Sequence, residues 1–514
     1  MFKIHETIIY FFIFILISSS IYLGYINSIY GEDFHHDFFI LSSSIFYKNG
    51  LELFDDIFLQ YGPGQVIFFD FLSNFININL FSISFITSII YSLNIFILFK
   101  IFEKISSTKI SFILIFLIYL IHPYSSYPWP DYLSGLCLSF FYYFFLKKNT
   151  KSNFFIYSIF LFSAVFFRST YLINILFAII LFSLIFFVLK KKNYFKNIFI
   201  SFLSLILVFF LILLYFNDLK DWYEQSIGQI TVYAAYTKHA EISEKITSYF
   251  GEYGFIILKI GYYFFKSTLN LIDISNVENI IFVLFILINI FFLLDILKNK
   301  SEISFEESRI IFICILGLSG FVQSLMHMEI FRNINATMGI FITTLYIIKE
   351  QRIKFFISKN LKLISTLIII YCIILIFKFP LTFYDSKKYV SFNNKYFLNK
   401  KLTPEVRSYY EEIRSFICVK ENVVYTNVSW DIAISHLCDN EKIKGKLSLT
   451  DITLVNFKKD EYKRLFTLNE LKENELFFVD KKIDNPEKVK LIKKFKSPLK
   501  QKDWYGDIFV YKKF

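Results

Sequence analysis

The chain has 514 residues, of which 55% are hydrophobic, 21% aromatic and only 19% charged, whereas a soluble globular protein is roughly 45–50% apolar and 25% charged. Its 69 Phe and 35 Tyr lie mostly in long apolar runs that a water-soluble core of this length could not bury, which excludes a soluble globular enzyme, a disordered chain, a coiled coil and a disulfide-dense secreted scaffold. The formal net charge is +12, and most of the excess lies in residues 384–514, with 27 Lys and Arg against 19 Asp and Glu.

Apolar runs along the first 380 residues predict an all-α polytopic membrane protein. Residues 7–29 form the first run long enough to cross a bilayer, and no cleavage pattern follows it, so we expect an uncleaved anchor. Further runs bring the number of predicted transmembrane helices to about eleven. These runs are 80–99, 110–121, 132–146, 153–167, 171–189, 197–216, 279–297, 310–326, 334–348 and 361–379.

Lysine and arginine occur at alternate junctions between these runs, which predicts a cytoplasmic N-terminus because cytoplasmic loops carry the positive excess. In contrast, residues 31–63 hold one Lys and six carboxylates. We therefore expect a multi-pass protein of the cytoplasmic (inner) membrane whose C-terminal residues lie on the periplasmic or extracytoplasmic side. The basic junctions contain Lys100, Lys104, Lys109, Lys147, Lys148, Lys151, Lys190, Lys191, Lys192, Lys196, Lys349, Arg352, Lys354, Lys359 and Lys362.

The sequence divides into a transmembrane part, 1–383, and a small soluble α/β domain, 384–514. The first part includes a long external loop over 30–79. Within the transmembrane part, runs 64–78 and 254–272 suit juxtamembrane helices better than spans, because crossing would invert the lysine pattern.

The soluble domain is predicted from short apolar segments and two cysteines. We expect Cys418 and Cys438 to pair on the oxidising side, with two free thiols as the alternative. The predicted strands are Val423 to Thr426, Leu476 to Val479 and Ile508 to Tyr511, and the predicted helices are Pro404 to Phe416 and Trp430 to Cys438.

The first external loop carries the strongest chemical signal. His35, His36 and Asp37 are followed at once by Phe38 and apolar residues, which hold the Asp37 carboxylate at the membrane surface, where it is placed to act as a general base. A divalent metal at His-His-Asp is the less favoured interpretation, because no third ligand has a diagnostic spacing. For the carboxylates of this loop the plain alternative is a solvated acidic loop.

Later in the same loop, Tyr61 opens the segment YGPG, which predicts a turn in which Pro63 fixes φ and Gly64 is free to adopt a positive φ. The next external junction places Trp129 and Asp131 at the end of a span; interfacial anchoring is the alternative role for the tryptophan. Two further external ends contribute the remaining polar side chains. They are Arg168, His327, Glu329 and Arg332.

An arginine near the hydrocarbon region is costly and needs a partner. Glu329 and Arg332 can form an intramembrane ion pair, or Arg332 can bind an anion, most plausibly a phosphate, because a guanidinium matches phosphate oxygens bidentately. The topology assigned from lysines brings all these residues to one membrane face. An amphiphilic substrate needs such a site: a base for a hydroxyl, cations for a lipid-linked phosphate, and aromatic walls.

These residues resemble those of the polytopic GT-C glycosyltransferases, the superfamily of protein O-mannosyltransferases and the lipid A aminoarabinose transferase. The resemblance lies in the order Asp37, Gly50, Asp56 and Tyr61-Gly62-Pro63 after the first span. The chain looks closest to bacterial members whose motif begins His-His-Asp, so that Phe38 replaces the usual acid or glycine. Three later segments are also similar to that group: PWPDY at 128–132, Arg168-Ser169-Thr170, and EIFRN at 329–333.

The resemblance implies transfer of a sugar from a polyprenyl-phosphate carrier to a glycan, lipid or protein acceptor, with no nucleic acid as partner. Asp37 would be the base and Arg332, with Arg168, would stabilise the departing phosphate; inversion is expected, and no cofactor is certain. His35, His36, Asp56, Tyr61, Trp129, Asp131, His327 and Glu329 would contact the substrates. The alternatives are a transporter or flippase for lipid-linked glycans, an O-antigen ligase or polymerase, and a structural envelope protein.

Overall fold

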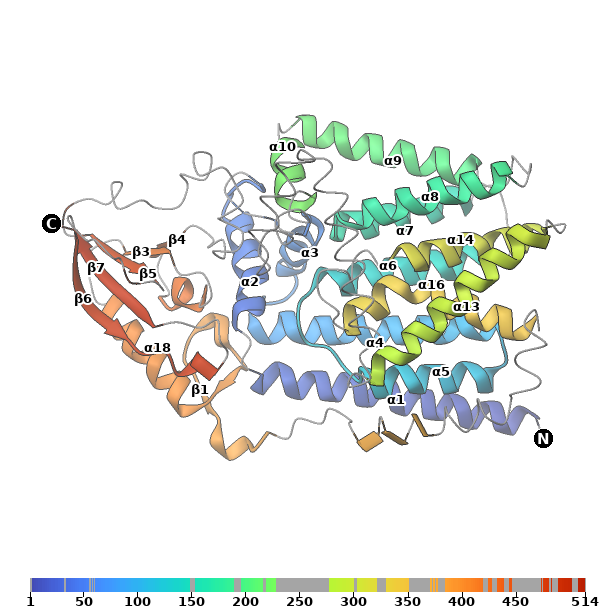
Figure 1. The fold of residues 1–514 in the computed structure, drawn as a ribbon. Helices are drawn as coiled ribbons and strands as arrows, with labels where there is room; N and C mark the ends of the chain where they lie inside the picture. The colour runs from blue at the N-terminus through green and yellow to red at the C-terminus, as the bar shows by residue number, and fades with distance from the viewer. Residues whose placement is uncertain are drawn as a thin grey trace, which may run out of the picture.

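A computed structural model gives the fold over most of the chain (Figure 1). It describes the backbone of residues 2–31, 34–54, 57, 59, 61–147, 153–188, 196–215, 219–227, 277–299, 303–320, 330–350, 370–371, 373–374, 376–377, 384–418, 424–427, 432–438, 443–445, 473, 475–479, 482, 489–501 and 507–513. The side chains of His35, His36 and Arg332 lie outside the description, as do the whole residues Asp56, His327 and Glu329.

The protein is mostly helical, and its long helices lie side by side in one bundle (Figure 1). They are built from continuous Phe, Ile and Leu runs, which pack on one another and leave further apolar side chains on the outside. The bundle helices are α1 (Phe2–Tyr30), α4 (Leu80–Ile105), α5 (Thr108–Ile121), α6 (Pro130–Phe145), α7 (Asn153–Phe167), α8 (Tyr171–Val188), α9 (Lys196–Tyr215), α13 (Val277–Asn299), α14 (Phe305–Ser319) and α16 (Ile330–Lys349).

Three of the described helices are long and apolar enough to cross a membrane: Glu6–Tyr30 within α1, Leu80–Ile105 and Tyr171–Val188. They indicate a membrane protein. The other predicted spans stay predictions, and the predicted span 310–326 is wrong in its bounds. Helix α14 begins at Phe305, because the Ser304 side chain caps it by accepting from the Glu307 backbone N–H at 3.1 Å, and it ends at Ser319.

The two ends of the bundle differ in charge. We call one the basic end; it contains Lys100, Lys104, Lys147 and Arg309. There Lys104 Nζ donates to the Tyr143 carbonyl at 3.1 Å, and Arg309 donates to the carbonyls of Phe145 and Lys147 at 2.9 and 3.0 Å. Opposite it is the loop end, where α1 ends and α4 and α6 begin.

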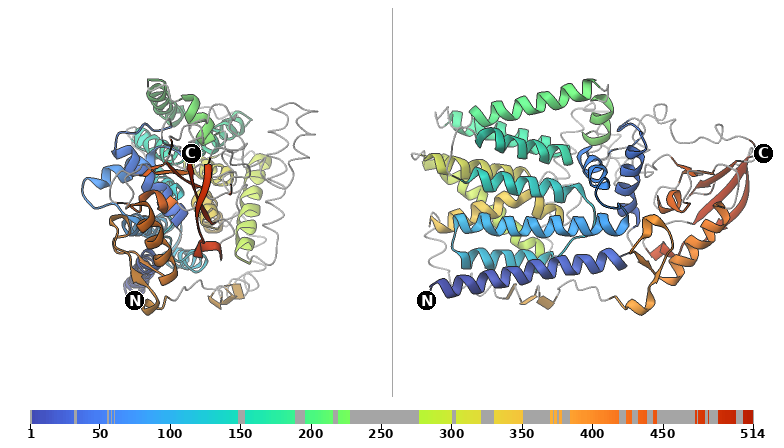
Figure 2. Two further views of the ribbon diagram at one scale, coloured as in Figure 1. Left: turned by 90° about the vertical axis from the view of Figure 1, so that its left-hand side faces the viewer. Right: turned by 180° about the vertical axis from the view of Figure 1, so that it is seen from behind.

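Two shorter helices, α2 (Phe34–Lys48) and α3 (Gly64–Ser73), cross the loop end between the bundle and most of the C-terminal residues (Figure 2). At the end of α1, Tyr30 stacks directly on Tyr384. Helix α3 has ten residues, a length of about 15 Å, or half of the hydrocarbon thickness of about 30 Å. The prediction that 64–78 does not form a span agrees with this length. The other ambiguous run, 254–272, lies outside the described residues.

Glycines bring α14 and α16 into backbone contact. A Cβ on Gly317 would overlap the backbone of α16, and a Cβ on Gly339 would overlap the carbonyl of Ile313. Small residues of this kind let helices approach closely enough for dispersion forces to hold them together in lipid.

Beyond α2, the C-terminal residues form a helix and a mixed sheet. Helix α18 (Pro404–Ile417) and the sheet order β4-β3-β5-β7-β6 make up this region. β3 pairs in parallel with β4 and β5, whereas β7 pairs antiparallel with β5 and β6. The strands are β3 (Val424–Asn427), β4 (Ile443–Gly445), β5 (Leu476–Val479), β6 (Val489–Phe495) and β7 (Ile508–Lys513).

Most of the predicted elements of this region are confirmed to within a few residues. The exception is the predicted helix Trp430 to Cys438, which is a short 3-10 helix, Ile432–His436. Strands β4 and β6 were not predicted. β6 lies at the edge of the sheet with its lysines outward. Because of these lysines, its sequence lacks the alternation of apolar and polar residues that predicts a strand.

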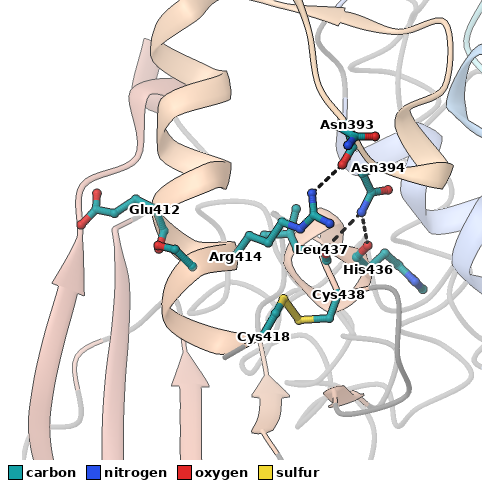
Figure 3. Close-up of a disulfide and its surroundings, with 9 residues drawn as sticks. Asn393, Asn394, Glu412, Arg414, Cys418, His436, Leu437 and Cys438 are labelled. Atoms are coloured by element: carbon teal, nitrogen blue, oxygen red, sulfur yellow. Dashed lines mark hydrogen bonds between the residues drawn. A yellow bond between two sulfur atoms is a disulfide. The ribbon is translucent and has the colours of Figure 1, made fainter. Parts of the chain in front are cut away.

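The C-terminal region packs directly on the first loop. Phe38 and Leu41 of α2 share one hydrophobic core with Phe397, Leu402 and other residues of the region. Cys418 and Cys438 form a disulfide, so the alternative of two free thiols is wrong. The bridge ties the end of α18 to the segment of His436, whose carbonyl accepts from Asn394 at 3.0 Å (Figure 3).

Candidate functional site

Asp37 lies in the first turn of α2 and points toward α4 and the C-terminal region. Its side chain is 5% exposed. The Ser84 hydroxyl donates to Oδ1 at 3.2 Å, and the Lys400 ammonium lies 3.6 Å from Oδ2. An ammonium at this distance stabilises the ionised carboxylate, which is the form that accepts a proton.

The position of Asp37 differs from the sequence expectation in one respect. The sequence placed it at the membrane surface in an acidic loop, but its neighbours Phe38 and Leu41 are buried in a core shared with the C-terminal region, and this packing covers the carboxylate. Lys400 was missed because it stands in a lysine-rich segment with no motif, and nothing local distinguishes it from its exposed neighbours.

A second cluster joins the ends of α6 and α7. Asp131, in the first turn of α6, is fully buried and forms an ion pair with Arg168, whose guanidinium is nearly buried. Arg168 Nε also donates to Thr170 at 3.1 Å. The sequence singled out both charged residues but not their pairing, because they belong to different junctions.

Tyr61 and Trp129 cover this ion pair. The Arg168 guanidinium lies 5.5 Å from the centroid of the Tyr61 ring, and the Tyr61 and Trp129 rings meet edge to face at 5.2 Å. Cation–π and edge-to-face contacts of this kind fix the orientation of the aromatic rings. The Tyr61 ring, with Trp129 packed on it, is therefore held against the buried Arg168 guanidinium.

The YGPG turn holds Tyr61 in place. The turn itself is confirmed, but its positive φ is at Gly62, at +141°, and not at Gly64, which is the first residue of α3. The turn is pressed onto the end of α7, where the Ser169 N–H donates to the Tyr61 carbonyl at 2.6 Å. A Cβ on Gly62 would lie 2.9 Å from the Ser169 hydroxyl, so both the backbone angle and the contact require glycine.

The two clusters are neighbours. Phe39, two residues after Asp37, contacts Tyr61 with ring centroids 6.4 Å apart. Near the ion pair, Asp131 Oδ1 is buried and accepts no hydrogen bond within the described part of the chain. Because buried carboxylate oxygens are normally satisfied, this atom is an acceptor available to a ligand hydroxyl or to water.

Helix α16 reaches the same end of the bundle. Asn335 lies against Gly135 of α6 and accepts from Asn94 at 3.0 Å, while Met338 accepts from Ser139. Residue numbers rise in the same direction in both helices, from Gly135 with Asn335 to Ser139 with Met338. Helices α6 and α16 therefore run parallel, and their N-terminal turns lie at the loop end. The backbone of Arg332 therefore lies at the loop end, as Asp131 does.

Other predicted site residues have no described position. Asp56, His327 and Glu329, and the side chains of His35, His36 and Arg332, lie outside the described part of the chain. Among the side chains that are described, no group of three or more His, Cys, Asp or Glu could hold a metal ion.

Comparison of the sequence with protein-family models and with curated proteins gives no match. The resemblance to GT-C glycosyltransferases therefore rests on short segments alone, which are those around Asp37, Tyr61, Asp131 and Arg168 and the segment 329–333. The first four of these, scattered over the first third of the chain, lie together at the loop end.

Proposed function

We propose that the protein is a membrane glycosyltransferase of the GT-C type. It would move a sugar from a polyprenyl-phosphate carrier to a glycan, lipid or protein acceptor. The observation that carries this proposal is the assembly at the loop end: a buried carboxylate, Asp37, beside an aromatic-covered ion pair, Asp131–Arg168, and the helix end that bears Arg332.

The proposal includes an orientation. Cations gather at the basic end, which by the positive-inside rule faces the cytoplasm. The N-terminus is then cytoplasmic, about eleven helices cross the inner membrane, and the loop end with the domain 384–514 is extracytoplasmic. A disulfide between Cys418 and Cys438 suits that oxidising side.

The proposed chemistry is a single displacement that inverts the sugar. Asp37 accepts the proton of the acceptor hydroxyl as its oxygen attacks the anomeric carbon. Arg332 stabilises the negative charge that grows on the departing lipid phosphate. Arg168 is already held by Asp131 and Thr170, so in this scheme it orients Tyr61 against the sugar and contributes positive potential rather than a free guanidinium.

A transporter would require ionisable side chains in the middle of its spans. In the described part of the chain, the buried charged side chains of the bundle lie within the first two turns of helices or directly after helix ends. Asp131 and Arg168 lie at the loop end, whereas Glu307 and Arg309 lie toward the basic end. None of these four lies in the middle of a span, which argues against passage through the bundle.

The central test is Asp37→Asn in membranes supplied with a polyprenyl-phosphate sugar and an extracted acceptor fraction. We expect sugar transfer to be abolished while the variant inserts and accumulates normally. Asp385→Asn is the matched control, because the Asp385 carboxylate is exposed and pairs only loosely with Lys388 at 3.8 Å. Near-normal turnover of Asp37→Asn would show that the base is another residue.

Two further experiments address the donor and the topology. Arg332→Ala should weaken the dependence on the lipid-phosphate donor more than that on the acceptor, and an equal loss for both would indicate a folding defect. Reporter fusions at Lys148 and Ser386 should report opposite sides of the membrane; the same side for both would overturn the orientation.

A further inference from the structure

Lys400 is a buried lysine that approaches the first loop from the C-terminal region. Its side chain is 1% exposed, and its ammonium lies 3.6 Å from the Asp37 carboxylate, which is 5% exposed. The two residues are 363 positions apart, and each belongs to a different part of the structure.

The backbone conformation around Lys400 directs its side chain toward Asp37. The preceding residue, Asn399, has φ +64°, and the Lys400 N–H donates to the Phe397 carbonyl at 2.8 Å. Phe397 before the turn and Leu402 after it are both fully buried in the core shared with α2. A left-handed residue between two such anchors fixes the direction in which Lys400 leaves the chain.

Stability alone does not account for the pair. A buried ion pair is often no more stable than an apolar pair of the same volume, because both charges must leave water. A base that has to work in this location nevertheless needs such a partner, since an unpaired carboxylate at this depth would take up a proton and could not accept one from a substrate.

Lys400 is the cation that the structure pairs with Asp37 among the described side chains. Ser84 of α4 contributes a neutral hydroxyl at 3.2 Å. His436 contacts α2 through Ser42, and burial together with the nearby Lys395 lowers its pKa to about 3, so it is neutral.

We propose that Lys400 is a positioning residue for Asp37, so that the C-terminal region completes the catalytic site of the bundle. This inference rests on the proposed glycosyl transfer. In that reaction the bond from the acceptor oxygen to the anomeric carbon forms, the bond to the phosphate oxygen breaks, and the acceptor proton passes to Asp37. Lys400 keeps its protons throughout and holds the carboxylate ionised and oriented before attack.

The test compares Lys400→Met, Lys400→Arg and the control Lys401→Met in the full-length protein, with turnover measured against pH and referred to folded protein. Lys401 is the neighbouring lysine, and its ammonium lies over the Tyr30 ring. We expect Lys400→Met to lose at least tenfold in turnover at neutral pH and to move the acidic limb of the profile upward by a pH unit or more. Lys400→Arg should keep the limb in place, and Lys401→Met should change neither quantity.

Each result decides the question. A Lys400→Met profile that keeps its shape and only loses amplitude would overturn the positioning role. If this variant does not fold, the double variant Asp37→Asn/Lys400→Met should fold, because both charges of the pair are removed together; failure of both to fold would make Lys400 structural and would also overturn the inference. Full activity of Asp37→Asn in the same assay would instead refute the proposed function, whatever Lys400 does.

Discussion

Separating Asp131 from Arg168 should destabilise the protein by an amount that their burial predicts. The Asp131 side chain is inaccessible and that of Arg168 is 7% exposed, so removing one partner leaves a charge buried without compensation. Such a loss costs about 3–5 kcal/mol. Removing both leaves no stranded charge, so the double variant Asp131→Ala/Arg168→Ala should be less destabilised than the two single losses added together, with a coupling of about 2 kcal/mol or more.

The assay is the free energy of unfolding in mixed micelles, measured by denaturing-detergent titration for the two single variants and the double. Asp385 and Lys388 provide the control cycle, because their side chains are 53% and 77% exposed and such pairs are worth about 0–1 kcal/mol. Additive losses at Asp131 and Arg168, within about 0.5 kcal/mol, would refute the argument that the pair is a closed buried unit.

Two other predictions concern packing and pH. Gly339→Leu should destabilise the protein by about 1–3 kcal/mol or more, because its Cβ would overlap the Ile313 carbonyl; Ile348→Leu on the exposed part of α16 is the control, and equal effects would contradict close helix contact. His436 has its pKa lowered from 6.5 to about 3, so the unfolded chain binds the proton first and stability should fall as pH drops from about 6 to 4, by about 1.4 kcal/mol per unit. His436→Gln should flatten this dependence, and an unchanged slope would assign it to other groups.

The helices of the bundle are largely predictable because each is encoded by a local run of apolar residues. Continuous apolar runs of about twenty residues identify a helix wherever they occur, and α4 begins at the expected residue, Leu80. The ends of helices are less predictable when charges lie inside them. The first two turns of α14 contain Glu306, Glu307 and Arg309, which are typical of a loop, and the helix start becomes evident only from the Ser304 cap.

The sequence identifies several residues of the candidate site, but it does not predict which residues they pair with. Asp37, Asp131 and Arg168 stand out because charges beside apolar runs are costly and need a reason. Their partners come from distant parts of the chain, and no local pattern connects Asp37 to Lys400 or Asp131 to Arg168. The same holds for Gly62, whose positive φ follows from the contact with Ser169 rather than from the turn sequence alone.

The order of synthesis separates the two halves of the Asp37–Lys400 pair in time. Lys400 follows Asp37 by 363 positions, which a ribosome covers in about 20–70 s at about 5–20 residues per second. During that interval the nascent protein carries the carboxylate without the ammonium. If Lys400 has the role inferred for it, a chain truncated before Lys400 would insert into the membrane and remain inert, so the enzyme would become active only once the ribosome has passed this residue.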